Sequence, residues 1–266
     1  MANYYAYGNA FATAADWLTL AGAAAAEYPG ENQADNIFWD ARSAEDLDTD
    51  PDQSANPSGI ENVTVQRGAA YKIATAAAPL TLKLAATPEL VFNNDQSGCI
   101  IYLVTKTTAV TKCTVNRTGS SADALHIVYD DVACVLMDIL GGNVTLDEYL
   151  NQLDNLGVAT MNVDSGPAGQ SPVVTLHAPV TTALNIYGGT VYWMSGTITK
   201  LNLYGGSFIS TKSTRARTLT NADVYGGMLD LRTGLADCIT VTNPIAVKGG
   251  SAASILFDVG QTVSLT

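Results

Sequence analysis

The sequence contains the stretch Leu184-Asn185-Ile186-Tyr187-Gly188-Gly189, which returns soon afterwards as Leu201-Asn202-Leu203-Tyr204-Gly205-Gly206. Each copy places an asparagine between two apolar residues and ends in a tyrosine and two glycines. Clear copies also occupy residues 222–227 and 245–250, and two fainter ones occupy residues 137–142 and 161–166. Internal repetition of this kind is typical of solenoids, because a single repeat cannot bury its own apolar edge and its neighbours must cover it.

The spacing of the copies predicts a parallel β-helix. With the first small residue of each pair as a marker, the markers stand at 141, 165, 188, 205, 226 and 249, in steps of 24, 23, 17, 21 and 23 residues. The period-two alternation before each marker is the pattern of a strand with one buried face. The pair of small residues would then form a corner that a larger side chain would obstruct.

Stacked coils place equivalent residues in columns along the axis. Tyrosine is enriched in protein interfaces, so an outward-facing column of tyrosines is a candidate interface. Two other interpretations stay open for it: a ladder that binds the faces of sugar rings, and simple ring stacking on the outside of the rod. We expect an outer column of Tyr187, Tyr204 and Tyr225, and an inner column of Ile139, Val163, Ile186, Leu203, Val224 and Val247.

Weaker markers extend the pattern toward the N-terminus. Arg67, Asn94 and Arg117 each follow apolar residues four and two positions earlier. They predict a solenoid that starts near residue 60 and has about nine coils. We therefore divide the chain into an N-terminal segment, residues 1–59, and a parallel β-helix, residues 60–266.

The N-terminal region differs from the repeats in charge and in aromatic content. Residues 1–61 carry eleven acidic residues and one basic residue, a net charge of −10, whereas residues 155–266 carry six basic and five acidic residues, a net charge of +1. We expect either an arm that docks onto a neighbouring molecule or a cap that plugs the open end of the rod. The candidate interface residues of this region are Tyr4, Tyr5, Tyr7, Trp17 and Trp39.

Composition excludes several classes of function. The chain is 47% hydrophobic and 14% charged, which indicates a substantial core, and no apolar run reaches the roughly 18 residues of a membrane-spanning helix. A formal net charge of −12 argues against a nucleic-acid partner, because phosphate binding needs basic patches. No basic residue precedes the Ala-rich stretch 11–26, so we predict no export signal and expect assembly in a cytoplasm.

Candidates for chemistry are few. Asp223 and Asp230 flank one predicted corner and are the best pair for the two carboxylates of a glycosidase, although polar residues on a solvated strand give the same pattern. His126 and His177 stand in no catalytic motif. The acidic run that begins at Asp46 does not fit a calcium-binding loop, because prolines occupy its glycine and final glutamate positions. We predict no catalytic residue, no cofactor and no metal.

Three further features are noted. Arg215 and Arg217 lie in a long turn, where they would either meet an anionic partner or have no special role. The segment from Thr145 to Gly157 reads either as a short helix with a capping box or as a strand followed by a loop. The cysteines are scattered and are expected to be buried free thiols: Cys99, Cys113, Cys134 and Cys238.

Several segments of the chain, in the order in which they occur, resemble those of a known group of proteins. The run Asn36-Ile37-Phe38-Trp39-Asp40, the acidic stretch through Asp52-Gln53-Ser54-Ala55, the strand Ile60–Val65 and the Gly-Gly coils together resemble bacteriophage virion proteins that build a right-handed parallel β-helix. Capsid decoration (cement) proteins and the related tailspikes belong to this group. The resemblance implies an all-β fold and a homotrimer bound outside an icosahedral shell, and it brings no active-site motif.

The sequence therefore predicts a non-enzymatic structural protein of a bacteriophage particle, most simply a capsid decoration protein that binds the major capsid protein. The expected partners include no nucleic acid and no membrane, and the expected location is the virion. The alternative is a tail fibre or tailspike protein that binds or cleaves host polysaccharide. A third interpretation, a bacterial adhesin-like surface protein, conflicts with the absence of an export signal.

Overall fold

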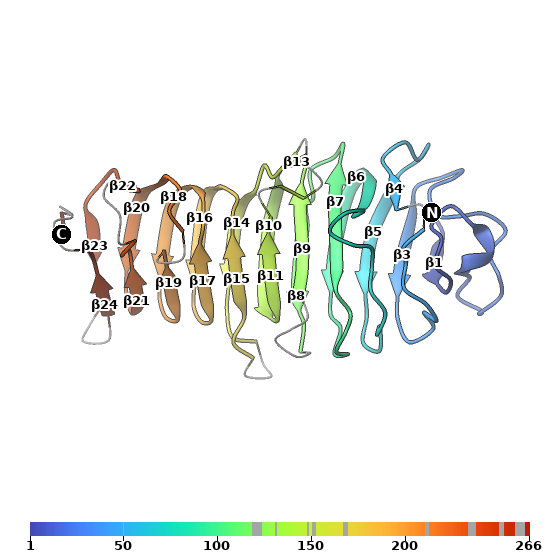
Figure 1. Ribbon diagram of the computed structural model, residues 1–266, viewed down its shortest axis with the longest axis horizontal. Coiled ribbons are helices and arrows are strands. Elements are labelled where there is room, and N and C mark those ends of the chain that lie inside the picture. The colour runs from blue at the N-terminus through green and yellow to red at the C-terminus, as the bar shows by residue number, and fades with distance from the viewer. Residues whose placement is uncertain are drawn as a thin grey trace.

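The chain is a rod of stacked β-coils in a computed structural model (Figure 1). Parallel strands follow one another along the axis in a β-solenoid of about 9 turns, which confirms the predicted fold class. The structure describes residues 1–49, 51–118, 124–130, 132–147, 149–150, 153–166, 170–210, 213–233, 238–249, 253–258 and 264–266. None of the helices in these ranges is long and apolar enough to cross a membrane.

The coils contribute their strands to two parallel sheets. Sheet 1 is formed by β1 (Asn3–Ala6), β3 (Asp35–Trp39), β5 (Ile60–Val65), the second part of β6 (Leu80–Phe92), β8 (Lys112–Asn116), β10 (Cys134–Gly141), β14 (Val158–Val163), β16 (Val180–Ile186), β18 (Gly196–Leu203), β20 (Arg217–Val224), β22 (Ile239–Val241) and β23 (Ile245–Val247). Sheet 2 is formed by β4 (Asp52–Gln53), the first part of β6, β7 (Ile101–Lys106), β9 (Ala124–Tyr129), β11 (Asn143–Leu146), β15 (Val173–Leu176), β17 (Thr190–Trp193), β19 (Ser207–Ile209), β21 (Gly227–Asp230) and β24 (Ala253–Leu256).

The register between coils is the one that the repeats predict. Asn185 pairs with Asn202, and Ile186 pairs with Leu203, so equivalent positions of the two repeats lie side by side. The inner column is buried as expected from Ile139 through Val224. Val247 is the exception, with 40% of its surface exposed. It lies in β23, beside which the described chain places only the short C-terminal stretch 264–266, joined to β23 by a bridge between Ile245 and Leu265.

The two glycines of a repeat have different reasons for lacking a side chain. A Cβ on Gly205 would stand 2.6 Å from the carbonyl oxygen of Tyr187 in the preceding coil, so the close approach of two backbones excludes it. Gly206 has a φ of +68°, a left-handed conformation that costs an L-residue energy. The predicted corner is therefore confirmed.

Parallel pairing begins before residue 60, which corrects the boundary predicted from the sequence. β1 pairs with β3, and β3 pairs with β5, in the same parallel sense as the later strands. The segment 1–59 therefore contains the first coils of the rod. At the N-terminal end, the short strand β2 (Trp17–Leu18) pairs antiparallel with β1 and follows a 3-10 turn at Ala14–Asp16, so this part caps the sheet.

The stretch from Thr145 to Gly157 forms strands. β11 continues through Leu146, and a small antiparallel hairpin of β12 (Tyr149–Leu150) and β13 (Leu153–Asp154) follows it and lies against β9. The strand interpretation of this stretch is therefore confirmed over its described residues, and the helical one is wrong there.

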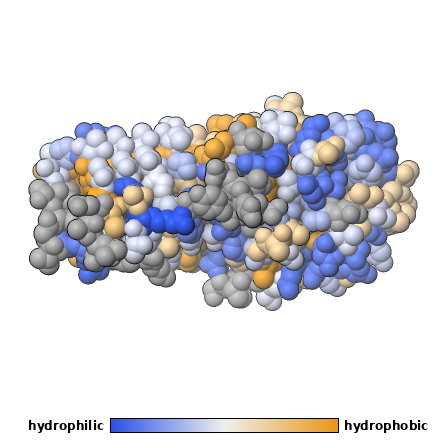
Figure 2. Space-filling view, turned by 45° about the horizontal axis from the view of Figure 1, so that its top comes forward, coloured by the Kyte–Doolittle hydropathy of each residue, from blue (hydrophilic) through white to orange (hydrophobic). Residues whose placement is uncertain are grey.

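One continuous hydrophobic core fills the interior of the rod. It runs from Phe11 and Trp17 at the N-terminal cap to Ile245 near the other end. At about 25 cal/mol per Å² of buried apolar surface, such columns of aliphatic side chains are the main source of stability. The outside is uneven: strongly hydrophilic residues gather over the N-terminal end of the rod (Figure 2).

Candidate functional site

A ladder of side-chain amides runs along the outer face of sheet 1. Asn162 donates to Asp138, Asn185 donates to Asn162, and Asn202 donates to Asn185, each from Nδ2 to Oδ1 at 2.8 Å. The strand register brings each amide directly over the one before it. The amides therefore satisfy one another and fix the outer surface of four consecutive coils.

The tyrosine ladder consists of Tyr187, Tyr204 and Tyr225. Each tyrosine follows an outward residue of its strand, Asn185, Asn202 or Asp223, by two positions. The Tyr187 and Tyr204 rings are stacked at 4.8 Å between centroids and 2° between planes, and the Tyr204 and Tyr225 rings at 4.7 Å and 14°. Tyr187 and Tyr204 are 48% and 42% exposed, and Tyr225 is partly buried. The predicted outer column is thus present, and its ring stacking is confirmed.

Ring stacking decides what the ladder can offer to a ligand. The two faces of the Tyr204 ring lie against Tyr187 and Tyr225, so this ring presents its edge and hydroxyl to solvent. A sugar ring binds an aromatic side chain through the face, and both faces of the Tyr204 ring are covered. The Tyr204 ring is therefore suited to contacts through its hydroxyl and edge, as protein groups make them.

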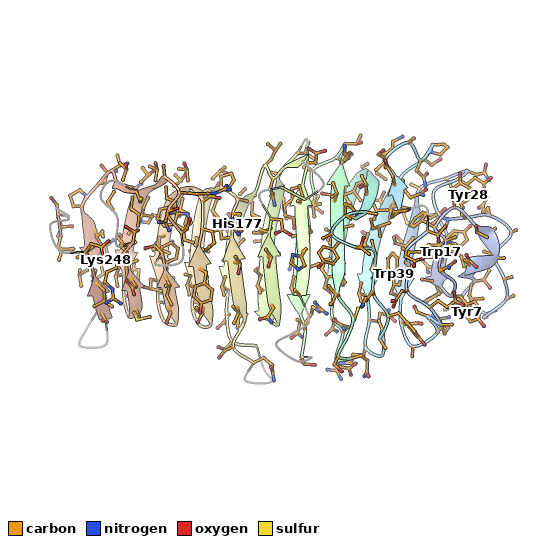
Figure 3. The ribbon with its side chains drawn as sticks, in the orientation of Figure 1. Tyr7, Trp17, Tyr28, Trp39, His177 and Lys248 are labelled. Atoms are coloured by element: carbon orange, nitrogen blue, oxygen red, sulfur yellow. The ribbon has the colours of Figure 1, made fainter. Side chains whose placement is uncertain are left out.

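Charged side chains close the C-terminal end of the ladder. Asp223 accepts hydrogen bonds from Lys200 at 2.6 Å and Lys248 at 3.0 Å. Burial raises the pKa of Asp223, but the two lysines outweigh that effect and the pKa is lowered. Lys248, labelled in Figure 3, also lies 6.0 Å from the centroid of the Tyr225 ring.

Burial, followed by the neighbouring tyrosines and Asp223, raises the pKa of Tyr204. Because an ionised phenol between two other phenols and a carboxylate is disfavoured, the Tyr204 hydroxyl stays protonated at neutral pH. It therefore offers a neutral donor and acceptor.

Four of the five N-terminal aromatic candidates are buried in the chain itself. Trp17 and Trp39, labelled in Figure 3, pack edge to face at 5.8 Å, and Trp17 donates its indole N–H to the carbonyl of Phe11 at 2.8 Å. Tyr4 and Tyr5 are 6% and 7% exposed, respectively. Tyr4, Trp17 and Trp39 belong to the interior core, whereas Tyr5 lies on the outer face between Phe38 and Arg42. None of the four is available as a docking surface.

Tyr7 is the remaining N-terminal candidate, and it is 47% exposed. Of the eight predicted interface residues, the accessible ones are therefore Tyr7, Tyr187, Tyr204 and, in part, Tyr225.

Asp223 and Asp230 each pair with basic side chains. Arg232 contacts Asp230 through two hydrogen bonds, of 2.9 and 2.7 Å. Those bonds lower the pKa of Asp230 against the smaller effect of burial. Both carboxyl groups therefore stay ionised at neutral pH, whereas a glycosidase needs one of them protonated as the general acid.

His126 lies on β9 of sheet 2, and His177 directly follows β15 of the same sheet. His126 stacks on Tyr102 at 4.5 Å, and its Nδ1 lies 2.9 Å from an Asp147 oxygen. Burial lowers the pKa of His177, and the charge of Asp147 opposes that shift. In the described residues no group of three or more His, Cys, Asp or Glu side chains is placed to hold a metal ion.

Arg217 is buried, contrary to the expectation of an exposed turn. Its guanidinium donates to the carbonyl oxygens of Trp193, Ser210 and Ser213 at 2.7 to 2.8 Å. It therefore ties the turn to the preceding coil, while Arg215 is exposed. The cysteines are free thiols: Cys99, Cys113 and Cys134 are buried as expected, and Cys238 is only partly buried.

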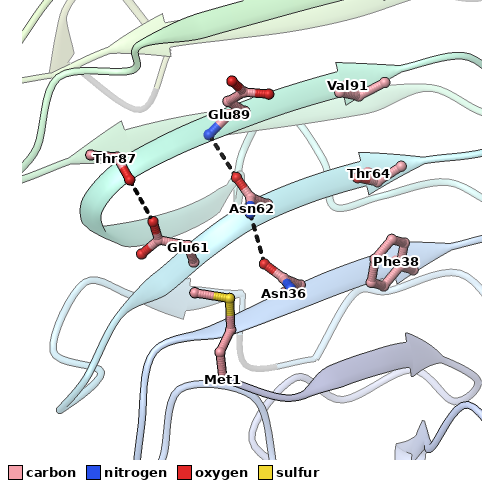
Figure 4. A pocket seen from close by; sticks show the side chains of 9 residues that line it. All are labelled: Met1, Asn36, Phe38, Glu61, Asn62, Thr64, Thr87, Glu89 and Val91. Atoms are coloured by element: carbon pink, nitrogen blue, oxygen red, sulfur yellow. Dashed lines mark hydrogen bonds between the residues drawn. The ribbon is translucent and has the colours of Figure 1, made fainter.

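The sequence did not reveal a hollow of about 360 Å³ on the outer face of sheet 1 near the N-terminal end (Figure 4). It crosses β3, β5 and β6. The residues that form it include Phe38, Glu61, Asn62, Thr64, Glu89 and Val91. The signal available in the sequence was the outward half of the strand alternation in β3, β5 and β6.

Comparison of the chain with known proteins identifies no relative. The chain matches no protein-family model, no curated protein and no solved structure.

Proposed function

We propose that the protein is a structural component of a bacteriophage particle, a capsid decoration protein that binds the major capsid protein through the tyrosine ladder. The support is the exposed stack of Tyr187, Tyr204 and Tyr225 on a rigid frame. Side chains that are already held in place lose little conformational entropy on binding, so such a surface favours tight contacts. The resemblance of the N-terminal stretch and the Gly-Gly coils to phage proteins supplies the identity of the partner.

In this proposal the solenoid carries the ladder and provides a stiff body. Backbone pairing continues from coil to coil, and the amide ladder adds side-chain bonds on the same face as the tyrosines. The homotrimer implied by the resemblance would place three such ladders on one particle. The N-terminal contact, which the sequence assigned to several aromatics, reduces to Tyr7 because the others are buried.

The test is cosedimentation of the purified protein with shells of the phage that encodes it. The variant carries Tyr187→Ser, Tyr204→Ser and Tyr225→Ser together. We expect it to lose at least about tenfold in affinity, because aromatic anchors dominate interface energies. The matched control is Tyr71→Ser, which removes a tyrosine of similar exposure, 40%, outside the ladder.

Full binding by the triple variant would show that the ladder is not the contact. Failure of the unaltered protein to bind any shell would reject the decoration role. Point variants are preferred to deletion of residues 1–59, because that deletion would remove β1 and β3 and uncover the core. Sedimentation equilibrium of the isolated protein tests the homotrimer separately.

A further inference from the structure

We propose that the hollow on sheet 1 binds a hexopyranose ring, the unit of a polysaccharide, stacked on Phe38. This site lies near the opposite end of the rod from the tyrosine ladder, and the inference does not rest on the proposed decoration function. It assigns a ligand to a part of the outer face where a stack of aromatic rings ends beside a hollow.

A column of aromatic rings on the outer face of sheet 1 ends at Phe38. Tyr5 and Phe38 stack at 4.9 Å and 20°, as the tyrosines of the later coils do. The strand register then places Thr64 next to Phe38 and Val91 next to Thr64. Because Thr64 is small, the space that a third ring would fill is left open above Phe38.

Figure 4 shows Phe38, Thr64 and Val91 on three successive strands along one side of the hollow. One face of the Phe38 ring is covered by Tyr5, and the ring lines the hollow. This differs from Tyr204, which is covered on both faces. The aliphatic C–H face of a sugar ring fits such a platform.

Two carboxylates, of Glu61 and Glu89, line the hollow. Glu61 is buried and accepts a hydrogen bond from the Thr87 hydroxyl at 2.8 Å. Glu89 is exposed, and its neighbour in the next strand, Lys112, forms an ion pair with Asp138 at 3.0 Å. The two carboxylates can therefore accept hydrogen bonds from sugar hydroxyls, and bonds to a charged acceptor are the strong ones.

Hydrogen bonds within the chain hold the polar residues of the hollow in place. Asn62 donates to Asn36 at 2.8 Å and accepts from the backbone N–H of Glu89 at 2.9 Å (Figure 4). These bonds hold β3, β5 and β6 in place around the hollow. A ligand would thus find the groups already oriented, which reduces the entropy lost on binding.

The test is a titration of the full-length protein with glucose, galactose, mannose and N-acetylglucosamine, followed by saturation-transfer NMR. Putrescine is included as a small cation. We expect at least one of the four sugars to bind saturably. The variant Thr64→Tyr fills the space above Phe38, and Glu89→Gln removes a charged acceptor at an exposed position; each should weaken binding by at least about tenfold.

Thr114→Tyr is the matched control, because Thr114 occupies the same column one coil beyond Val91 and does not line the hollow. It should leave sugar binding unchanged. The proposal is wrong if none of the four sugars binds, if putrescine binds in their place, or if Thr64→Tyr and Glu89→Gln bind as well as the unaltered chain. Circular dichroism of each variant verifies that the coils are intact.

Discussion

The coils after residue 180 and the coils before residue 120 share the same two sheets but differ in how the chain turns between them. In the later coils Gly188-Gly189 and Gly205-Gly206 form corners only 17 residues apart (205 − 188). In the earlier coils the markers Arg67 and Asn94 are 27 residues apart (94 − 67), and β6 bends from one sheet into the other. Where successive corners are few residues apart, the same residues recur in the sequence. Where they are farther apart, the recurrence is lost.

The difference also separates two kinds of surface. Where the corners repeat, like side chains stack into ladders, and the outer face becomes regular. Where they do not, neighbouring strands bring unlike residues together, such as Phe38 beside Thr64, and a hollow opens. Regular coils thus favour an extended contact, and irregular coils favour a local binding site.

The largest expected effect tests whether the two regions share one core. Leu203→Ala in the later coils and Ile37→Ala in the earlier ones should each lower the free energy of unfolding by about 2 to 5 kcal/mol, because both side chains are fully buried in one cluster. Guanidinium denaturation measures both. Val135→Ala is the control, since that side chain is 52% exposed. A cost below about 1 kcal/mol for Ile37→Ala would mean that the earlier coils are an independent arm.

The next effect concerns the corners that only the later coils repeat. Gly206→Ala should cost about 2 to 4 kcal/mol, because the new Cβ meets both a positive φ and the Gly189 carbonyl oxygen at 2.5 Å. Gly22→Ala should cost about 1 to 2 kcal/mol, since Gly22 has a φ of +80° but nothing within 4 Å of its Cβ position. Thermal denaturation compares them. Equal costs would show that backbone contact between coils does not matter at the corner.

A smaller effect compares the amide ladders of the two regions. Asn185 and Asn36 each donate to one asparagine and accept from another at 2.8 Å. Asn185→Ala and Asn36→Ala should therefore destabilise the protein similarly, by about 1 to 2 kcal/mol each in urea denaturation. Thr114→Ala, on the same outer face, serves as the reference. If the two substitutions differed greatly in the free energy of unfolding that they remove, only one of the two ladders would stabilise the protein.

The smallest effect depends on pH and lies where the two regions meet. Because burial lowers the pKa of His177, the folded protein holds this ring neutral more firmly than the unfolded chain does. The unfolded chain then binds more protons as the pH falls, so the free energy of unfolding should decrease from about pH 6.5, the ordinary value for histidine, downward to the folded pKa.

His177→Gln should flatten this part of the stability profile. The neighbouring titratable groups are Asp147, whose charge opposes the shift, and His126, which contacts Asp147. His126→Gln is therefore the companion variant, and an unchanged pH profile in His177→Gln would rule out this explanation.

The sequence predicted the later coils well because their corners are built from backbone contact. Gly205 and Gly206 have to be glycines for reasons that recur at Gly188-Gly189 and Gly226-Gly227, so the pattern is visible without a structure. The start of the rod was placed too late, since β1 and β3 are separated by a long connection that hides their period.

The candidate sites were less predictable, because burial depends on neighbours far along the chain. Trp17 and Trp39 read as surface aromatics, yet they close the end of the core against each other. The asparagines of the repeats were recognised as outward residues, but their hydrogen bonds depend on the register between coils. The hollow depends on which residue of β5 lies next to Phe38, and only pairing between distant strands decides that.

The amide ladder also has a direction. Every Nδ2 points toward the N-terminal coil and every Oδ1 toward the C-terminal one, and the row ends on the carboxylate of Asp138, which can only accept. Rotating a single amide would set two donors, or two acceptors, against each other. One acidic side chain therefore fixes the direction in which the side-chain dipoles of three asparagines in successive coils are aligned.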